Sequence, residues 1–131
     1  MLIDTNIFLE VLLNQQKAES CQRILQEVKE GKYKAIVTNF TIDSIAIIMN
    51  RNKISISSIE LFIKSLSACK GLSFYQISFK DRINALKWIK KYNLDYEDAL
   101  ILQSAISNKK EEILSLDSHF DRVKEIKRIK P

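Results

Sequence analysis

The segment MLIDTNIFLEVL, residues 1–12, joins two hydrophobic patterns at a single acidic residue. Its first three residues form a short apolar run, which predicts a strand. Apolar side chains then recur at helical spacing, at Ile7, Phe8, Val11 and Leu12. Asp4 stands between the two patterns. The segment therefore predicts a strand that leads directly into a helix, with a carboxylate at the carboxyl end of the strand.

The same unit of strand followed by helix repeats along the rest of the chain. Apolar, β-branched runs predict further strands at residues 35–38, 73–77 and 113–116, with a Lys-rich edge strand within 123–130. Helical periodicity predicts helices at residues 18–28, 40–51, 57–66, 79–92 and 96–107. Ser57 and Ser58 are the expected N-caps of the third of these helices, and Gly31 follows the end of the first. This alternation favours a three-layer α/β/α sandwich with a mainly parallel central sheet.

Length and composition fit one domain that spans residues 1–131. The chain is 46% hydrophobic, which is enough to build a core of its own. Lys and Arg number 21 against 16 Asp and Glu, a net charge of +5 that suits a polyanionic partner such as RNA. Candidate phosphate contacts are Lys87, Lys90, Lys91, Lys109 and Lys110, although solvation alone also explains such lysines.

The cysteines and the N-terminal sequence indicate a reducing compartment. Cys21 and Cys69 lack the spacing of a zinc site or a redox pair. The early apolar stretch is interrupted by Asp4, Asn6 and Glu10, so it resembles no secretory signal, and no apolar run is long enough for a membrane span. We therefore expect a cytoplasmic protein without a membrane partner.

Four carboxylates fall at places where separate strands and helices begin or end. Asp4 and Asp117 follow predicted strands, while Asp43 and Asp98 lie near the starts of predicted helices. Apolar sequence beside each one would draw it toward the core, where unpaired carboxylates are costly. A hard divalent cation would neutralise them, and an all-oxygen site selects Mg²⁺ or Mn²⁺.

Three motifs in this order resemble the PIN-domain family. They are LIDTNIFLEVL at 2–12, DYEDALILQSA at 95–105 and ILSLDSHFD at 113–121. The length is similar to that of VapC-type toxins from toxin–antitoxin modules. This resemblance implies an α/β/α sandwich, metal-dependent cleavage of RNA, frequent homodimers and often an antitoxin partner. It points to an endoribonuclease that hydrolyses phosphodiester bonds, with an activated water and no side-chain nucleophile.

The resemblance also implies roles for individual residues. Asp4, Asp98 and Asp117 match the metal-coordinating acids of the family. Asn6 and Ser115 match its polar helper residues.

The second acidic position departs from the family pattern. Family members usually have Glu on the third helix, where this chain offers Asp43, one methylene shorter. Asp43 is retained as a catalytic candidate, with contact through a water molecule as the alternative to direct ligation. Glu97 and Asp121 are accessory acids close to the motif residues.

Other interpretations of these residues stay open at this stage. Asp4 and Asp98 could cap helices, Asp117 could end a strand in a turn, and Asp43 could stabilise a helix dipole. His119 is either an exposed loop histidine or an acid that contacts phosphate.

Two apolar sets also have alternative interpretations. Trp88, Tyr92 and Tyr96 could stack RNA bases, or could belong to a helical core stripe or a dimer surface. An apolar helical stripe is the candidate dimer surface, although core burial explains it equally well: Ile59, Phe62, Ile63 and Leu66.

Two rival functions place acids in similar positions. A non-catalytic PIN-like protein that binds RNA or serves as a scaffold is one alternative, because of the change from Glu to Asp. A phosphoryl-transfer receiver or phosphatase is the other. It is disfavoured because Asp4-Thr5-Asn6 lacks the second Asp of a D-x-D-x-T motif and no well-placed Lys follows Asp117.

Overall fold

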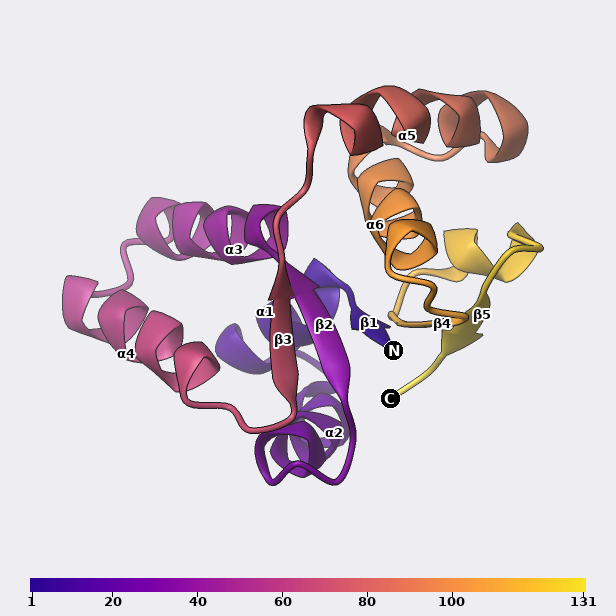
Figure 1. Cartoon of the computed structure of the whole chain (residues 1–131). Helices are drawn as coiled ribbons and strands as arrows, with labels where there is room; N and C mark the ends of the chain where they lie inside the picture. The colour runs from indigo at the N-terminus through magenta and orange to yellow at the C-terminus, as the bar shows by residue number, and fades with distance from the viewer.

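A five-stranded parallel sheet forms the centre of the protein (Figure 1). The computed structural model describes residues 1–131. The strands are β1 (Leu2–Ile3), β2 (Ala35–Thr38), β3 (Leu72–Tyr75), β4 (Glu112–Leu114) and β5 (Lys127–Ile129). Their order in the sheet is β3-β2-β1-β4-β5, and every neighbouring pair is parallel. The first strand is therefore central, and the predicted edge strand near the C-terminus is confirmed as β5.

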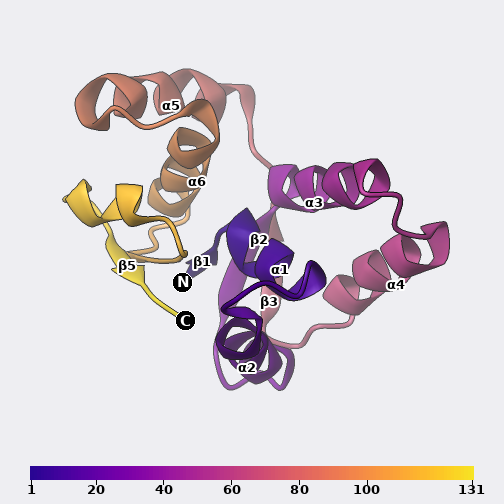
Figure 2. The same ribbon diagram turned by 180° about the vertical axis from the view of Figure 1, so that it is seen from behind.

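Helices cover both faces of this sheet, as the two opposite views show (Figures 1 and 2). They are α1 (Thr5–Leu12), α2 (Ala18–Lys29), α3 (Asn39–Arg51), α4 (Ile56–Ser67), α5 (Phe79–Tyr92), α6 (Tyr96–Ser107) and the short 3-10 helix η1 (Ser118–Arg122). Helices α1 to α4 share one hydrophobic core with the sheet, and α5 and α6 share the other. The predicted three-layer sandwich is confirmed.

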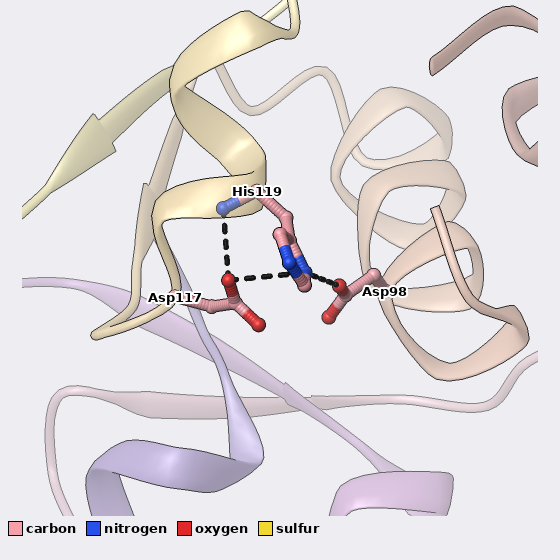
Figure 3. A group of neighbouring side chains, drawn as sticks. All are labelled: Asp98, Asp117 and His119. Carbon is pink, nitrogen blue, oxygen red and sulfur yellow. Dashed lines mark hydrogen bonds and ion pairs between the residues drawn. The ribbon is translucent and has the colours of Figure 1, made fainter. Parts of the chain in front are cut away.

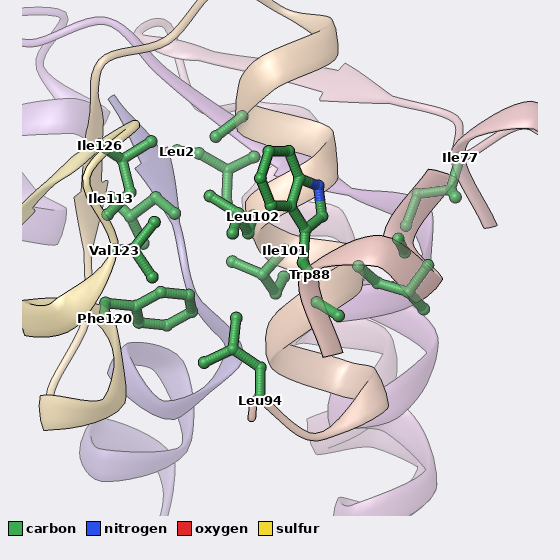
Figure 4. Close-up of a cluster of buried hydrophobic side chains, with 14 residues drawn as sticks. Leu2, Ile77, Trp88, Leu94, Ile101, Leu102, Ile113, Phe120, Val123 and Ile126 are labelled. Atoms are coloured by element: carbon green, nitrogen blue, oxygen red, sulfur yellow. The ribbon is translucent and has the colours of Figure 1, made fainter. Parts of the chain in front are cut away.

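Neighbouring residues of each central strand enter different cores. Leu2 packs in the core beneath α5 and α6 (Figure 4), whereas Ile3 packs beneath α1 to α4. In β4, Ile113 packs in the same core as Leu2, and Leu114 packs in the same core as Ile3. Successive side chains of a strand point to opposite faces, so a continuous apolar run is what a strand covered on both sides requires.

Two details of the helices differ from the sequence-based prediction. Helix α4 begins earlier than predicted, because Ser55, and not Ser57 or Ser58, accepts the capping hydrogen bond from the backbone of Ser58 at 3.2 Å. The apolar stripe of α5 faces solvent: Phe79, Ile83 and Leu86 are 86%, 69% and 50% exposed. The buried face of α5 instead carries Asp81, Ala85 and Trp88.

A partly buried chain of hydrogen bonds joins α5 to α6. The indole of Trp88 donates to Oε1 of Gln103 at 2.8 Å, and Nε2 of Gln103 donates to Oγ of Ser107 at 3.1 Å. Ser107 then donates to Oδ1 of Asp81 at 2.6 Å, while Tyr75 donates to Oδ2 of the same carboxylate at 2.7 Å. Trp88 is therefore a core residue that fixes the α5–α6 pair, and its ring does not offer a surface for base stacking.

The remaining features concern cysteines and membrane spans. Cys21 and Cys69 are free thiols. None of the helices has the length and apolar character that a membrane crossing requires.

Candidate metal centre

The carboxyl ends of the two central strands bring distant acids together. Asp4 follows β1 and Asp117 comes shortly after β4. Because β1 and β4 are parallel neighbours, their carboxyl ends lie at the same edge of the sheet. Helix α6 adds Asp98, the third residue from its start, which is buried. Three of the four predicted catalytic acids thus lie at this edge: Asp98 and Asp117 belong to one close group, and Asp4 lies beside it, near enough for the charge of Asp98 to raise the pKa of Asp4.

His119 lies between two of these acids (Figure 3). Its Nδ1 is 3.2 Å from Oδ2 of Asp98 and 3.2 Å from Oδ1 of Asp117. The ligand atoms of these three side chains all lie within 4.8 Å of one another. The backbone N–H of His119 also donates to Oδ1 of Asp117 at 2.8 Å, and this hydrogen bond holds the first turn of η1 against the carboxylate. The arrangement offers two oxygens and one nitrogen to a single small cation.

Asp4 is held in place by two polar side chains. Ser115 donates from Oγ to Oδ2 of Asp4 at 2.6 Å, and Nδ2 of Asn6 donates to the same oxygen at 2.7 Å. Asn6 also accepts from the backbone of Leu116 at 3.1 Å, and Ser115 accepts from the backbone of Asp117 at 2.9 Å. The two predicted helper residues therefore connect Asp4 to the segment that carries Asp117.

The electrostatics of the site show a shortage of positive charge. Burial raises the pKa of Asp4 to about 7, and the charges of Asp98 and Glu97 add to this effect, while the hydrogen bond from Ser115 opposes it. Burial likewise raises the pKa of Asp98 to about 6, assisted by the charges of Asp95 and Asp117. Carboxylates that resist ionisation in this way gain from a nearby cation. The donor set and its charge thus fit a hard divalent ion.

Helix capping does not account for Asp4 or Asp98. Asp4 occupies the position before α1, but its side chain makes no capping hydrogen bond. Helix α6 is capped by Asp95, which accepts from the backbone of Asp98 at 2.8 Å. Asp117 does cap η1, so its carboxylate has a structural role as well.

The sequence as a whole identifies the family. The family model described as PIN domain matches residues 1–126. This chain belongs to the PIN domain family. The resemblance drawn from the three motifs is therefore confirmed. Among curated proteins, no sequence match was found.

Three solved structures share the fold of this PIN domain. VapC20 of Mycobacterium tuberculosis, described as a toxin that cleaves the sarcin-ricin loop, superposes with a TM-score of 0.78 at 11% identity, covering 99% of this chain and 98% of that one. A toxin–antitoxin complex from Klebsiella pneumoniae gives 0.72 at 16% identity, covering 96% and 94%. VapBC2 of Rickettsia felis, bound to a DNA fragment from its promoter, gives 0.69 at 14% identity, covering 98% and 96%. At these identities the likeness shows the fold.

Asp43 does not join the acidic cluster of this PIN domain. Helix α3 buries Thr41, Ile45 and Met49, whereas Asp43 is exposed. At about 100° per residue, Asp43 lies roughly 200° around the helix from Thr41, on the opposite side. The predicted second acid is therefore directed away from the core, and its charge is not among the main causes of the raised pKa of Asp4 or Asp98.

The two accessory acids have different surroundings. Glu97 is exposed, yet its charge contributes to the raised pKa of Asp4, so it lies beside the site. Asp121 forms a bidentate ion pair with Arg128, with both contacts at 2.6 Å. Arg128 also donates to the backbone carbonyls of Ser115 and Leu116, at 3.4 and 3.3 Å. Asp121 therefore helps to hold the strand end that precedes Asp117.

His119 is the site residue that sequence analysis underrated. Its side chain is 52% exposed, as expected of a loop histidine, but the ring faces Asp98 and Asp117. The sequence feature that could have indicated this role is its position two residues after Asp117, at the start of a turn that follows the strand end.

Proposed function

We propose that this PIN domain is an endoribonuclease that uses Mg²⁺ or Mn²⁺ to hydrolyse phosphodiester bonds of RNA. The observation that carries the proposal is the convergence of Asp4, Asp98 and Asp117, with the pKa of Asp4 and Asp98 raised by burial and mutual repulsion. A purely structural role gives no reason to gather unneutralised carboxylates at one point.

The residues of the proposed site have two roles, to hold the ion and to orient a ligand. When bound, the divalent ion supplies an activated water and neutralises phosphate charge. Asp4, Asp98 and Asp117 would hold it, while Ser115 and Asn6 orient the Asp4 carboxylate by hydrogen bonds of 2.6 and 2.7 Å. Asp43 is proposed to lie outside this set, because its side chain faces solvent on α3.

Two features of the chain suit RNA. The chain carries a net charge of +5, which favours binding of a polyanion. Tyr96, at the start of α6 and two residues before Asp98, is 45% exposed and offers a ring on which a base could stack. Tyr92 is engaged elsewhere, since its hydroxyl donates to Glu125 at 2.6 Å.

We further propose that the protein is the toxin of a toxin–antitoxin pair and acts in the cytoplasm. One of the similar structures is described as a toxin–antitoxin complex and another as a toxin. An open apolar groove of about 240 Å³ runs between α1, α2 and α4, with Phe8, Leu12, Leu25 and Leu66 in its lining. Such a groove could receive the apolar face of an antitoxin segment.

A homodimer through α5 is also proposed. The α4 residues Phe62 and Leu66 are buried in the core of their own chain, so the α4 stripe is largely used within the monomer. The α5 stripe of Phe79, Ile83 and Leu86 is exposed and runs along one face. Monomers rarely leave such a face uncovered, and a two-fold axis would pair it with its own copy.

The proposed function is tested by metal-dependent cleavage. Purified protein is incubated with a fluorescently labelled RNA pool of random sequence, in EDTA, Mg²⁺ or Mn²⁺. Cleavage is expected only with a divalent ion. The same ions should raise the melting temperature, since a hundredfold excess over the dissociation constant adds roughly 2.7 kcal/mol. Metal-induced stabilisation without cleavage would favour the non-catalytic alternative, whereas cleavage in EDTA would exclude the metal-dependent mechanism.

A further inference from the structure

We propose that His119 is a nitrogen ligand of the metal and that it biases this site toward Mn²⁺ and away from Mg²⁺. The inference rests on the proposed function, because it assumes that Asp98 and Asp117 hold a divalent ion. It concerns this chain in particular, in which Asp43 is exposed on α3 and the group of close ligand atoms contains His119 in place of a further acid.

The position of the imidazole nitrogen supports ligation. Nδ1 of His119 is 3.2 Å from one oxygen of Asp98 and 3.2 Å from one oxygen of Asp117. An octahedral ion with bonds of about 2.1 Å holds neighbouring donor atoms about 3 Å apart. Nδ1 therefore already lies at nearly the spacing of an adjacent ligand from each of the two carboxylate oxygens, and all three atoms lie within 4.8 Å of one another.

A hydrogen bond explains this position less well. Nδ1 carries at most one proton, so it can donate along a good line to only one of the two carboxylates. Equal distances to both leave the proton shared between two weak interactions. A cation placed among the three atoms would interact with each of them along its lone pair.

The mixed donor set determines which ion is favoured. Mg²⁺ prefers oxygen ligands, whereas imidazole raises affinity for first-row transition metals, of which Mn²⁺ also accepts carboxylates. A site with oxygen from Asp98 and Asp117 and nitrogen from His119 should therefore bind Mn²⁺ more tightly than Mg²⁺. Replacing the nitrogen by an amide oxygen should remove most of this preference.

The decisive experiment is pulsed electron paramagnetic resonance of Mn²⁺ bound to the full-length protein, which detects the nuclear spin of a directly coordinated ¹⁴N. The wild-type spectrum should show ¹⁴N modulation. This measurement does not depend on the folding of any variant. His119→Gln should abolish the modulation and reduce the ratio of Mn²⁺ to Mg²⁺ affinity by roughly 10-fold. Ser118→Ala, at the adjacent exposed residue of η1, is the matched control and should retain both properties.

Failure of the proposed role of His119 and failure of the proposed function would give different results. If Mn²⁺ binds without ¹⁴N modulation, the role of His119 is excluded while the metal-dependent function stands. If the protein binds neither Mn²⁺ nor Mg²⁺ at millimolar concentration, the metal centre and the proposed function fail together. Modulation that persists in His119→Gln would assign the nitrogen to another group and overturn this inference.

Discussion

Oγ of Ser115 donates a 2.6 Å hydrogen bond to Oδ2 of Asp4, although 111 positions separate the two residues in the sequence. Oγ of Ser115 also accepts a hydrogen bond from the backbone N–H of Asp117 at 2.9 Å. One buried hydroxyl thus connects the acid that ends β1 to the segment that follows β4. This hydrogen bond also lowers the pKa of Asp4, against the larger effect of burial.

Ser115→Ala should weaken both the fold and metal binding. The substitution leaves the Asp117 N–H without its acceptor and removes a donor from Asp4, a loss of about 1–3 kcal/mol in unfolding free energy. The metal dissociation constant should rise by roughly 10-fold or more, the usual effect of removing a group that orients a ligand. Urea denaturation and metal titration measure the two effects.

Ser104→Ala is the matched control for this prediction. Ser104 is as fully buried as Ser115, but its hydroxyl donates only to the carbonyl of Leu100 one turn earlier in α6. That carbonyl keeps its helical partner after the substitution, so the cost should be small and the metal affinity unchanged. Equal metal affinities for Ser115→Ala and Ser104→Ala would show that Ser115 does not orient Asp4.

Much of this arrangement could be predicted from the sequence for a simple physical reason. A short apolar run followed by an acid predicts a strand end, and parallel strands align their carboxyl ends, so Asp4 and Asp117 were expected to meet. The bounds of α5 and α6 agree with the predicted ranges. Asn6 and Ser115 lie beside Asp4, where the family resemblance placed them.

Other features depended on information that local sequence does not contain. The face of α3 on which Asp43 lies is decided by which residues pack against the sheet, and Thr41 and Ile45 occupy that face. The buried face of α5 carries Asp81, Ala85 and Trp88, while the apolar residues Phe79, Ile83 and Leu86 are exposed. Polar networks between distant residues leave no periodic pattern.

The pH dependence of stability should show the contribution of Asp81. Burial opposes its ionisation, but hydrogen bonds from Ser107, Ser78 and Tyr75 outweigh burial and lower its pKa to about 2. A carboxylate with a lowered pKa in the folded state stabilises the protein above pH 4, and this contribution is lost as the pH falls from about 4 to about 2.

Asp81→Asn should therefore cost roughly 2 kcal/mol at pH 7 and much less near pH 2. The amide also presents donors to the hydroxyl donors of Ser107 and Tyr75, which adds to the loss at neutral pH. Urea denaturation of the two proteins at pH 7, 4 and 2.5 gives the difference directly. A difference that stays constant over this range would exclude an ionised Asp81 as its source.

Self-association should depend on α5. Ile83→Glu places a charge in the middle of the exposed α5 stripe and should convert a dimer to a monomer, because a buried unpaired carboxylate is costly at an interface. Leu61→Glu makes the same kind of change at an exposed apolar residue of α4 and should leave the dimer intact. Light scattering measures the molar mass of both variants in solution. A wild-type mass of 15.2 kDa at high concentration would contradict the dimer itself.

The central claim is that Asp4, Asp98 and Asp117 form a metal-dependent nuclease site, and Asp4→Asn tests it through stability and activity together. The raised pKa of Asp4 means that its contribution to stability is lost as the pH rises from about 4 to about 7. The metal-free variant, which cannot ionise there, should therefore melt at an equal or higher temperature than the wild type at pH 8.

Cleavage of labelled RNA by Asp4→Asn in Mn²⁺ is the most direct single measurement. The rate should fall by roughly 100-fold or more, because a ligand of the ion that activates the water is lost. Asp43→Asn, the same change at an exposed carboxylate of α3, should cleave within about twofold of the wild type. Full cleavage by purified Asp4→Asn protein would contradict the assignment of the site.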